Sequence, residues 1–195
     1  GLRFNWWPCG HSNPRREKLM ARLRKKDRDV EDAADVAPEG DGGRERGPWD
    51  STEKSVAGDP NYVDLGSLIV RGDDRYALQL PADNDEGDIG SVILVAEESA
   101  LELRAFAATR SGGLWDDVRA DITEGVGRLG GEATEGEGPY GIELMVTMPA
   151  TSDDGQTGVA PSRIMGIEGP RWMLRATLLG EAALVPDEHP LMEAL

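Results

Sequence analysis

The chain has 195 residues, with 21 Lys or Arg against 37 Asp or Glu, so its formal net charge at pH 7 is −16. This length suits one domain with a hydrophobic core, and the negative charge argues against binding to nucleic acid or anionic membranes, which depends on basic side chains. The sequence contains neither an apolar run of about 20 residues nor a signal-peptide pattern, so we expect a cytoplasmic protein with no membrane contact.

Residues 1–19 differ from the rest of the chain, because Cys9, His11 and two tryptophans crowd into a stretch without sustained periodicity. We interpret this stretch as a non-native or upstream segment, since Met20 provides a plausible start. Cys9 and His11 are therefore not expected to be ligands. The remaining chain has no cysteine and only one histidine, His189, which leaves little metal or nucleophile chemistry.

Residues 20–47 are predicted to be a disordered charged tail. A basic block at 22–28 precedes an acidic block at 29–41, and large apolar side chains are scarce. Such a segment buries too little surface to offset the entropy lost on ordering. We interpret the basic block as a solvated terminus; the alternative is an electrostatic handle for an acidic partner or for the acidic remainder of the chain.

Residues 48–195 are predicted to form a single α+β domain that opens with strands. The first four strands are expected at residues 63–70, 76–80, 91–96 and 101–107. In the last of these, Leu101 and Leu103 share one face while Glu102 and Arg104 share the other, which indicates an antiparallel sheet with one wet face. An acidic loop is expected at 83–90.

An amphipathic helix is predicted next, since its apolar residues recur at steps of three and four. These residues are Leu114, Trp115, Val118, Ile122, Val126 and Leu129. Ser111 is the expected cap region, and Gly130 with Gly131 is the expected stop.

Further strands are expected at residues 142–148, 162–167 and 172–179, with a hairpin turn at 153–155. A C-terminal helix is expected from Pro186 to Leu195, and its lack of a stop signal suggests that the chain is cut short there. The fold class is therefore an antiparallel sheet of about six strands, with the central helix and the C-terminal helix on one face. The order of elements also resembles that of type III secretion chaperones, but fold does not imply function.

Several motifs resemble the actinobacterial domain of unknown function 3710 family. The matching segments are Gly47-Pro48-Trp49-Asp50, Asp64-Leu65-Gly66-Ser67-Leu68, Phe106-Ala107-Ala108-Thr109-Arg110-Ser111-Gly112-Gly113-Leu114-Trp115 and Gly169-Pro170-Arg171-Trp172. Their order and spacing fit from about Trp49 to Leu195. The resemblance implies a small cytosolic protein with a charged N-terminal tail. It brings no catalytic residues and no cofactor.

The segment Arg110-Ser111-Gly112-Gly113 is the candidate binding site, because backbone N–H groups at a helix N-terminus backed by an arginine can bind an anion. Arg171, Trp172 and Arg175 are expected to line the same mouth if their strand lies beside the helix. The structural alternative is that these glycines only make the turn and that Trp115 belongs to the core.

Two functions follow from the sequence. The chain has no nucleophile elbow, phosphate loop, dinucleotide fingerprint or metalloprotease motif, and its adjacent aspartates are typical of solvated turns, so no metal or cofactor is expected. This favours a non-catalytic protein-interaction or chaperone-like module, with another protein as partner. The alternative is a small-anion or nucleotide-phosphate binding protein, enzymatic or not, that uses the Arg110 to Gly113 turn.

Overall fold

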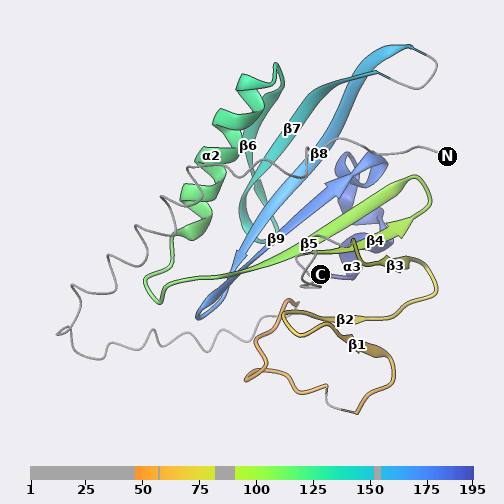
Figure 1. Ribbon diagram of the computed structural model, residues 1–195, viewed down its shortest axis with the longest axis vertical. Coiled ribbons are helices and arrows are strands. Elements are labelled where there is room, and N and C mark those ends of the chain that lie inside the picture. The colour runs from red at the N-terminus through yellow and green to blue at the C-terminus, as the bar shows by residue number, and fades with distance from the viewer. Residues whose placement is uncertain (1–46, 57, 82–90, 152–154) are drawn as a thin grey trace. The chain divides into compact units, whose positions relative to one another are not determined.

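The computed structural model describes residues 47–56, 58–81, 91–151 and 155–195. The predictions for the segment 1–19, for the tail up to residue 46, for the acidic loop 83–90 and for most of the turn at 153–155 concern residues outside this set. Figure 1 shows the described residues in colour.

An antiparallel sheet of seven strands is the main element, with the order β3-β4-β5-β9-β8-β7-β6. Its strands are β3 (Ala77–Gln79), β4 (Val92–Ala96), β5 (Ser99–Ala107), β6 (Glu132–Gly138), β7 (Gly141–Thr151), β8 (Thr157–Glu168) and β9 (Trp172–Leu179). Two further strands, β1 (Tyr62–Asp64) and β2 (Ile69–Arg71), form a separate hairpin. The α+β class is confirmed, although the described residues form more strands than expected.

One of the differences in strand number has a local explanation. The expected strand at 63–70 is two strands, because the chain turns at Gly66, where φ is 85° and the Asp64 carboxylate accepts a hydrogen bond from the Gly66 N–H at 2.8 Å. A left-handed φ is accessible to glycine at little cost. The strand β6 was not expected at all.

One face of the sheet carries the main hydrophobic core, and we call it the α3 face. The helical elements on this face are the 3-10 helices η1 (Gly180–Ala183) and η2 (Pro186–Glu188) and the short helix α3 (Pro190–Glu193). Fully buried leucines from β4, β5 and β9 pack against the buried Leu191 of α3; these are Leu94, Leu101 and Leu178. The expected C-terminal helix is thus broken into two short pieces, and their apolar side chains close the core.

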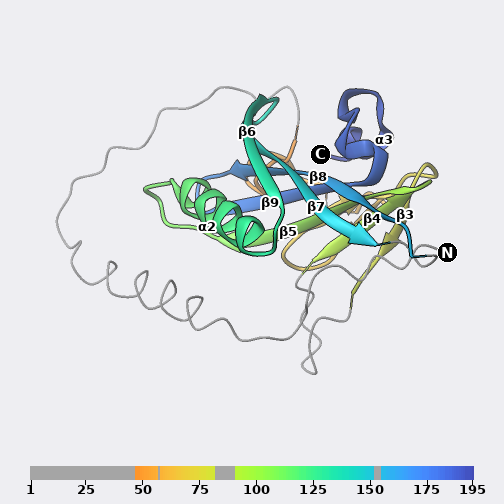
Figure 2. The ribbon, with the colours of Figure 1, turned by 90° about the horizontal axis from the view of Figure 1, so that it is seen from above.

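The opposite face carries the helix α2 (Leu114–Arg128), and we call it the α2 face. Figure 2 shows α2 and α3 on opposite sides of the sheet, so the expectation that both helices share one face was wrong. The reason lies in β7 and β8, which have buried apolar side chains on both faces. Leu144 and Ile164 point to the α2 face, whereas Met165 and Ile167 point to the α3 face, and both sets need cover.

Candidate functional site

The N-terminus of α2 is held by a carboxylate from the sheet. Gly112 and Gly113 have φ values of 63° and 80°, which turn the chain from β5 into the helix. Glu168, at the end of β8, accepts hydrogen bonds from the Gly113 N–H at 3.3 Å and from the Trp115 N–H at 3.1 Å. The first-turn amides therefore already bind an anion, and that anion belongs to the protein.

Ser111 was expected to cap this helix, and that expectation was wrong. Its hydroxyl lies 2.9 Å from the Thr109 hydroxyl, and the N-cap residue is Gly113, which has no side chain to cap the helix. Local sequence cannot reveal a cap that comes from another strand. The glutamate that replaces Ser111 in this role is far away in the chain and becomes a neighbour only through the fold.

Trp115 lies buried between α2 and the sheet. Its indole N–H donates to the Ile142 carbonyl at 2.6 Å, and a side chain at Gly166 would collide with the indole ring. The tryptophan thus fixes the helix over β7 and β8. These contacts pack Trp115 into the core of the protein.

The structure does not bring all the remaining candidates together. Arg110 and Arg171 are exposed in neighbouring turns, whose backbones are joined by a hydrogen bond from the Ala108 N–H to the Arg171 carbonyl at 2.8 Å. Trp172 lies on the α3 face, where its indole N–H donates a hydrogen bond to the Asp50 carboxylate at 2.7 Å. The pKa of Asp50 is lowered mainly by hydrogen bonds from Thr52 and to a smaller extent by the hydrogen bond from this indole. Arg175 lies on the α2 face, because it is three positions after Trp172 and successive side chains of a strand alternate.

Arg175 belongs instead to a charged cluster on β5 and β9, which we call the arginine patch: Glu102, Arg104, Phe106 and Arg175. Arg104 and Arg175 are directly opposite each other in the antiparallel register. One carboxylate serves both, since Glu102 lies 3.6 Å from a terminal nitrogen of Arg104 and 3.7 Å from one of Arg175. The Phe106 ring centre lies 5.8 Å from the Arg175 guanidinium carbon.

Arg175 is poorly satisfied for a side chain so far from water. Its side chain is 18% exposed, and its Nε is buried with no hydrogen-bond partner among the described residues. Burial lowers the pKa of Arg175, an effect that the Glu102 carboxylate opposes. A buried polar nitrogen without a partner is uncommon in folded proteins and calls for an explanation.

Comparison with protein families identifies the chain. A family model described as "Protein of unknown function (DUF3710)" matches residues 47–195, which includes all the described elements. The chain belongs to the DUF3710 family. The resemblance seen in the motifs is thereby confirmed at family level. Comparison with curated proteins and with solved structures gave no match.

Two structural findings bear on what the DUF3710 domain contacts. No helix within the described ranges is long and apolar enough to cross a membrane. The same residues contain no group of three or more His, Cys, Asp or Glu placed to hold a metal ion.

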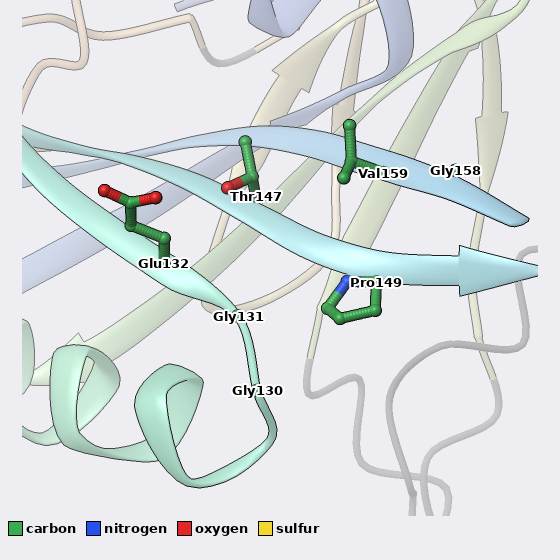
Figure 3. A pocket seen from close by; sticks show the side chains of 7 residues that line it. All are labelled: Gly130, Gly131, Glu132, Thr147, Pro149, Gly158 and Val159. Carbon is green, nitrogen blue, oxygen red and sulfur yellow. The ribbon is translucent and has the colours of Figure 1, made fainter.

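An open depression of about 530 Å³ lies along β6, β7 and β8 in the DUF3710 domain (Figure 3). It is lined by Gly130, Gly131, Glu132, Thr147, Pro149, Gly158 and Val159. Glu132 is its only ionisable lining residue, and Val159 is 70% exposed. Among the described residues, no acid–base pair converges on this depression.

Sequence reasoning found Arg175 but missed the three residues that surround it in the DUF3710 domain. The alternation in residues 101–107 correctly placed Glu102 and Arg104 on one face. Nothing in the sequence indicated that this face adjoins Arg175, because β5 and β9 are far apart in the chain and meet only through the sheet register.

Proposed function

We propose that the DUF3710 domain is a non-catalytic protein-interaction module, and that a segment of another protein binds the α2 face over β4, β5 and β9. One observation carries this proposal: α2 packs against β6, β7 and β8, whereas no helix of the described residues packs over the β3-β4-β5-β9 part of the same face. A sheet face that remains without a helix is a common place for a partner to bind.

The side chains of this area support the proposal by their chemistry. Ile93 and Val95 of β4 point to the same face as Glu102 and Phe106 of β5, and all four are half-buried. Glu102 and Phe106 belong to the arginine patch, which also contains Arg104 and Arg175. A mixture of apolar, aromatic and arginine side chains is typical of protein interfaces, in which arginine and aromatic residues provide much of the binding energy.

The alternative function, an anion or nucleotide-phosphate site at the Arg110 to Gly113 turn, has less support. An external anion there would compete with the Glu168 carboxylate, which already accepts hydrogen bonds from two amides of the turn. Internal competition of this kind weakens binding. A thermal-shift experiment with inorganic phosphate on the wild type and on Arg110→Ala tests this point, and a phosphate-induced shift that Arg110→Ala abolishes would favour the alternative.

Position-dependent photo-crosslinking tests the interaction module. A photoreactive amino acid replaces Gln79, which is exposed on β3 and points to the α2 face, and the matched control replaces Glu181, which is exposed on η1 at the other face. We expect a specific crosslinked protein from position 79 of the full chain and not from position 181. Equal products from both positions would count against the proposal.

The crosslinked protein is then purified, and its affinity for the full chain is measured directly. Val95→Lys places a charge on the proposed surface, and we expect it to weaken binding by about tenfold or more. Glu181→Lys introduces the same side chain on the opposite face and serves as the control. Unchanged affinity for a folded Val95→Lys variant would exclude this face as the binding surface.

A further inference from the structure

We propose that two copies of this chain pair through the free edge of β8, with Val159 of one copy directly opposite Val159 of the other on a two-fold axis. The inference goes beyond the proposed function and does not depend on it, because it concerns the outer ends of β7 and β8 and not the α2 face over β4, β5 and β9. The partner is a second molecule of the same protein, so each copy uses the same surface.

The outer ends of β7 and β8 form a two-stranded arm, which we define as residues 148–151 and 157–161. The strand β6 pairs with β7 only as far as Thr147, and β9 pairs with β8 only from Ser162 onward. The arm residues continue to pair with each other, and Figure 1 shows this ribbon extending past β6 and β9. A two-stranded hairpin is only marginally stable by itself, so a further strand would stabilise the arm.

The β8 edge of the arm presents its backbone groups in a regular pattern. Gly169 directly follows β8, and its N–H donates to the Trp172 carbonyl at 2.9 Å in the register of β8 with β9. Every second residue counted back from Gly169 therefore directs its backbone groups away from β7. In the arm these residues are Thr157, Val159 and Pro161. No strand within the described ranges pairs with them on that side, so these groups are open to another chain.

This pattern of donors and acceptors is complementary to itself. When a second copy lies antiparallel, Val159 and the partner's Val159 exchange a pair of backbone hydrogen bonds. Thr157 is then opposite the partner's Pro161, so the Thr157 N–H meets a carbonyl. The N–H that proline lacks leaves only the Thr157 carbonyl without a bond from the other copy, and Thr157 is exposed to water.

The side chain of Val159 supports the same position for the axis. It is 70% exposed, more than any other large apolar side chain of the described residues. Directly opposite side chains of an antiparallel pair lie on the same face, about 5 Å apart. Each Val159 would therefore cover the other, and removing this apolar surface from water favours association.

Charge also favours the arm as the place where two copies meet. The chain has a net charge of −16, so two copies repel each other over most of their surfaces. The described part of the arm has no ionisable side chain, whereas free strand edges are commonly protected by charged residues. The opposite edge of the arm, along β7, is less suitable, because Pro149 leaves Thr151 as its outward N–H donor and Glu132 adjoins it. Asp153 and Asp154 lie outside the described residues.

Disulfide trapping in the full chain tests the register directly. Val159→Cys is made in a Cys9→Ser background, which removes the single natural cysteine. The Cα atoms of a hydrogen-bonded pair are about 5.5 Å apart, which suits a disulfide. The matched control, Thr157→Cys, is on the same strand and face, but the two-fold axis would hold its two copies roughly 14 Å apart along the strands. We expect covalent dimers to form at least about tenfold faster from Val159→Cys. Equal rates for the two variants would overturn the proposal.

Sedimentation equilibrium of the full chain tests association without a disulfide. The pairing is small for a protein interface, so we expect a reversible dimer with a Kd of about 100 µM. Val159→Pro removes an N–H that points away from β7, so the arm keeps its own hydrogen bonds while the dimer weakens by at least about tenfold.

Thr151→Pro is the matched control for the sedimentation experiment. It removes an outward N–H from the opposite edge of the arm and should leave the Kd within about twofold. A wild-type chain that stays monomeric at about 1 mM would overturn the proposal. So would a dimer that Thr151→Pro abolishes and Val159→Pro preserves, because that result would assign the pairing to the β7 edge.

Discussion

Two arginines on neighbouring strands, Arg163 of β8 and Arg175 of β9, are buried to the same extent and have different surroundings. Their side chains are 17% and 18% exposed. On the α3 face, the Nε of Arg163 donates to the Ala183 carbonyl at 3.1 Å, and a terminal nitrogen donates to the Glu143 carboxylate. On the α2 face, the Nε of Arg175 has no such partner in the described residues. Burial alone therefore does not show whether the fold satisfies an arginine side chain, whereas its hydrogen bonds do.

The Arg163 pair has the properties of a closed structural element. Glu143 is 3% exposed, and its burial raises the pKa of the carboxyl group, while the charge and the hydrogen bond of Arg163 oppose that rise. One Glu143 oxygen has no hydrogen-bond partner among the described residues, so this carboxylate depends on Arg163. Removing either partner should leave a buried charge without compensation.

The largest expected effect is that of Arg163→Met. This change leaves the Glu143 carboxylate buried without its cation, so we expect the free energy of unfolding to fall by about 3 kcal/mol. Urea denaturation at neutral pH measures it. Arg171→Met is the control for loss of an exposed arginine and should change the stability by less than about 0.5 kcal/mol. Similar results for the two variants would show that the Glu143 pair contributes little.

A smaller loss is expected for Glu102→Gln. The amide keeps the size of the side chain but removes a charge that lies close to both Arg104 and Arg175, so their mutual repulsion is offset less. We expect a loss of about 1 kcal/mol in urea denaturation, and that loss should shrink when salt is raised, because the groups are partly accessible to solvent. A gain in stability would contradict the assignment of Glu102 as the shared counterion.

Arg175→Met is expected to have the opposite effect on the free energy of unfolding. Methionine keeps an apolar stem and removes a desolvated charge with an unpaired nitrogen, so we expect the stability to stay constant or to rise by up to about 1 kcal/mol. The same substitution at Arg163 is the matched comparison. A loss as large as that of Arg163→Met would mean that Arg175 is a structural residue, which would remove the contrast between the two sites.

The smallest signal is expected from pH, because it depends on one carboxyl group. The pKa of Glu143 in the folded protein is raised above its ordinary value of 4.5, so the folded state holds this proton more tightly than the unfolded state does. The stability difference between wild type and Glu143→Gln should therefore decline as pH rises from 4.5 through the folded pKa, and should stay level above it. In the Arg163→Met background this decline in stability with pH should be steeper, because the cation that opposes the rise of the Glu143 pKa is gone. A stability advantage of the wild type over Glu143→Gln that grows with pH would contradict the predicted direction.

The segments whose apolar residues recur with a regular period were predictable from the sequence, and the elements with weak local patterns were not. Residues 101–107 and 114–129 were assigned correctly because their apolar residues follow one period without interruption. The edge strand β6 has the sequence Glu-Ala-Thr-Glu-Gly-Glu-Gly, which has no apolar alternation, and it is a strand because it pairs with β7. Context of this kind overrides local propensity.

The candidate site likewise has features that the sequence predicted and features that it did not. The sequence pointed to the turn before α2 and to Arg175 as single features. It did not show that Glu168 would bind the amides of that turn or that Arg104 would be directly opposite Arg175. Both facts depend on the strand register, which short-range patterns do not encode. Charged residues in predicted strands were the available signal, and their partners could be identified only from the structure.

The hydrogen bonds between Glu168 and the start of α2 also bear on the order in which parts of the chain fold. The capping oxygens belong to a residue 55 positions after Gly113 and 53 positions after Trp115. During synthesis from the N-terminus, α2 is complete in sequence well before its cap exists. The Gly113 and Trp115 amides therefore gain their carboxylate acceptor only when the end of β8 docks against the start of the helix.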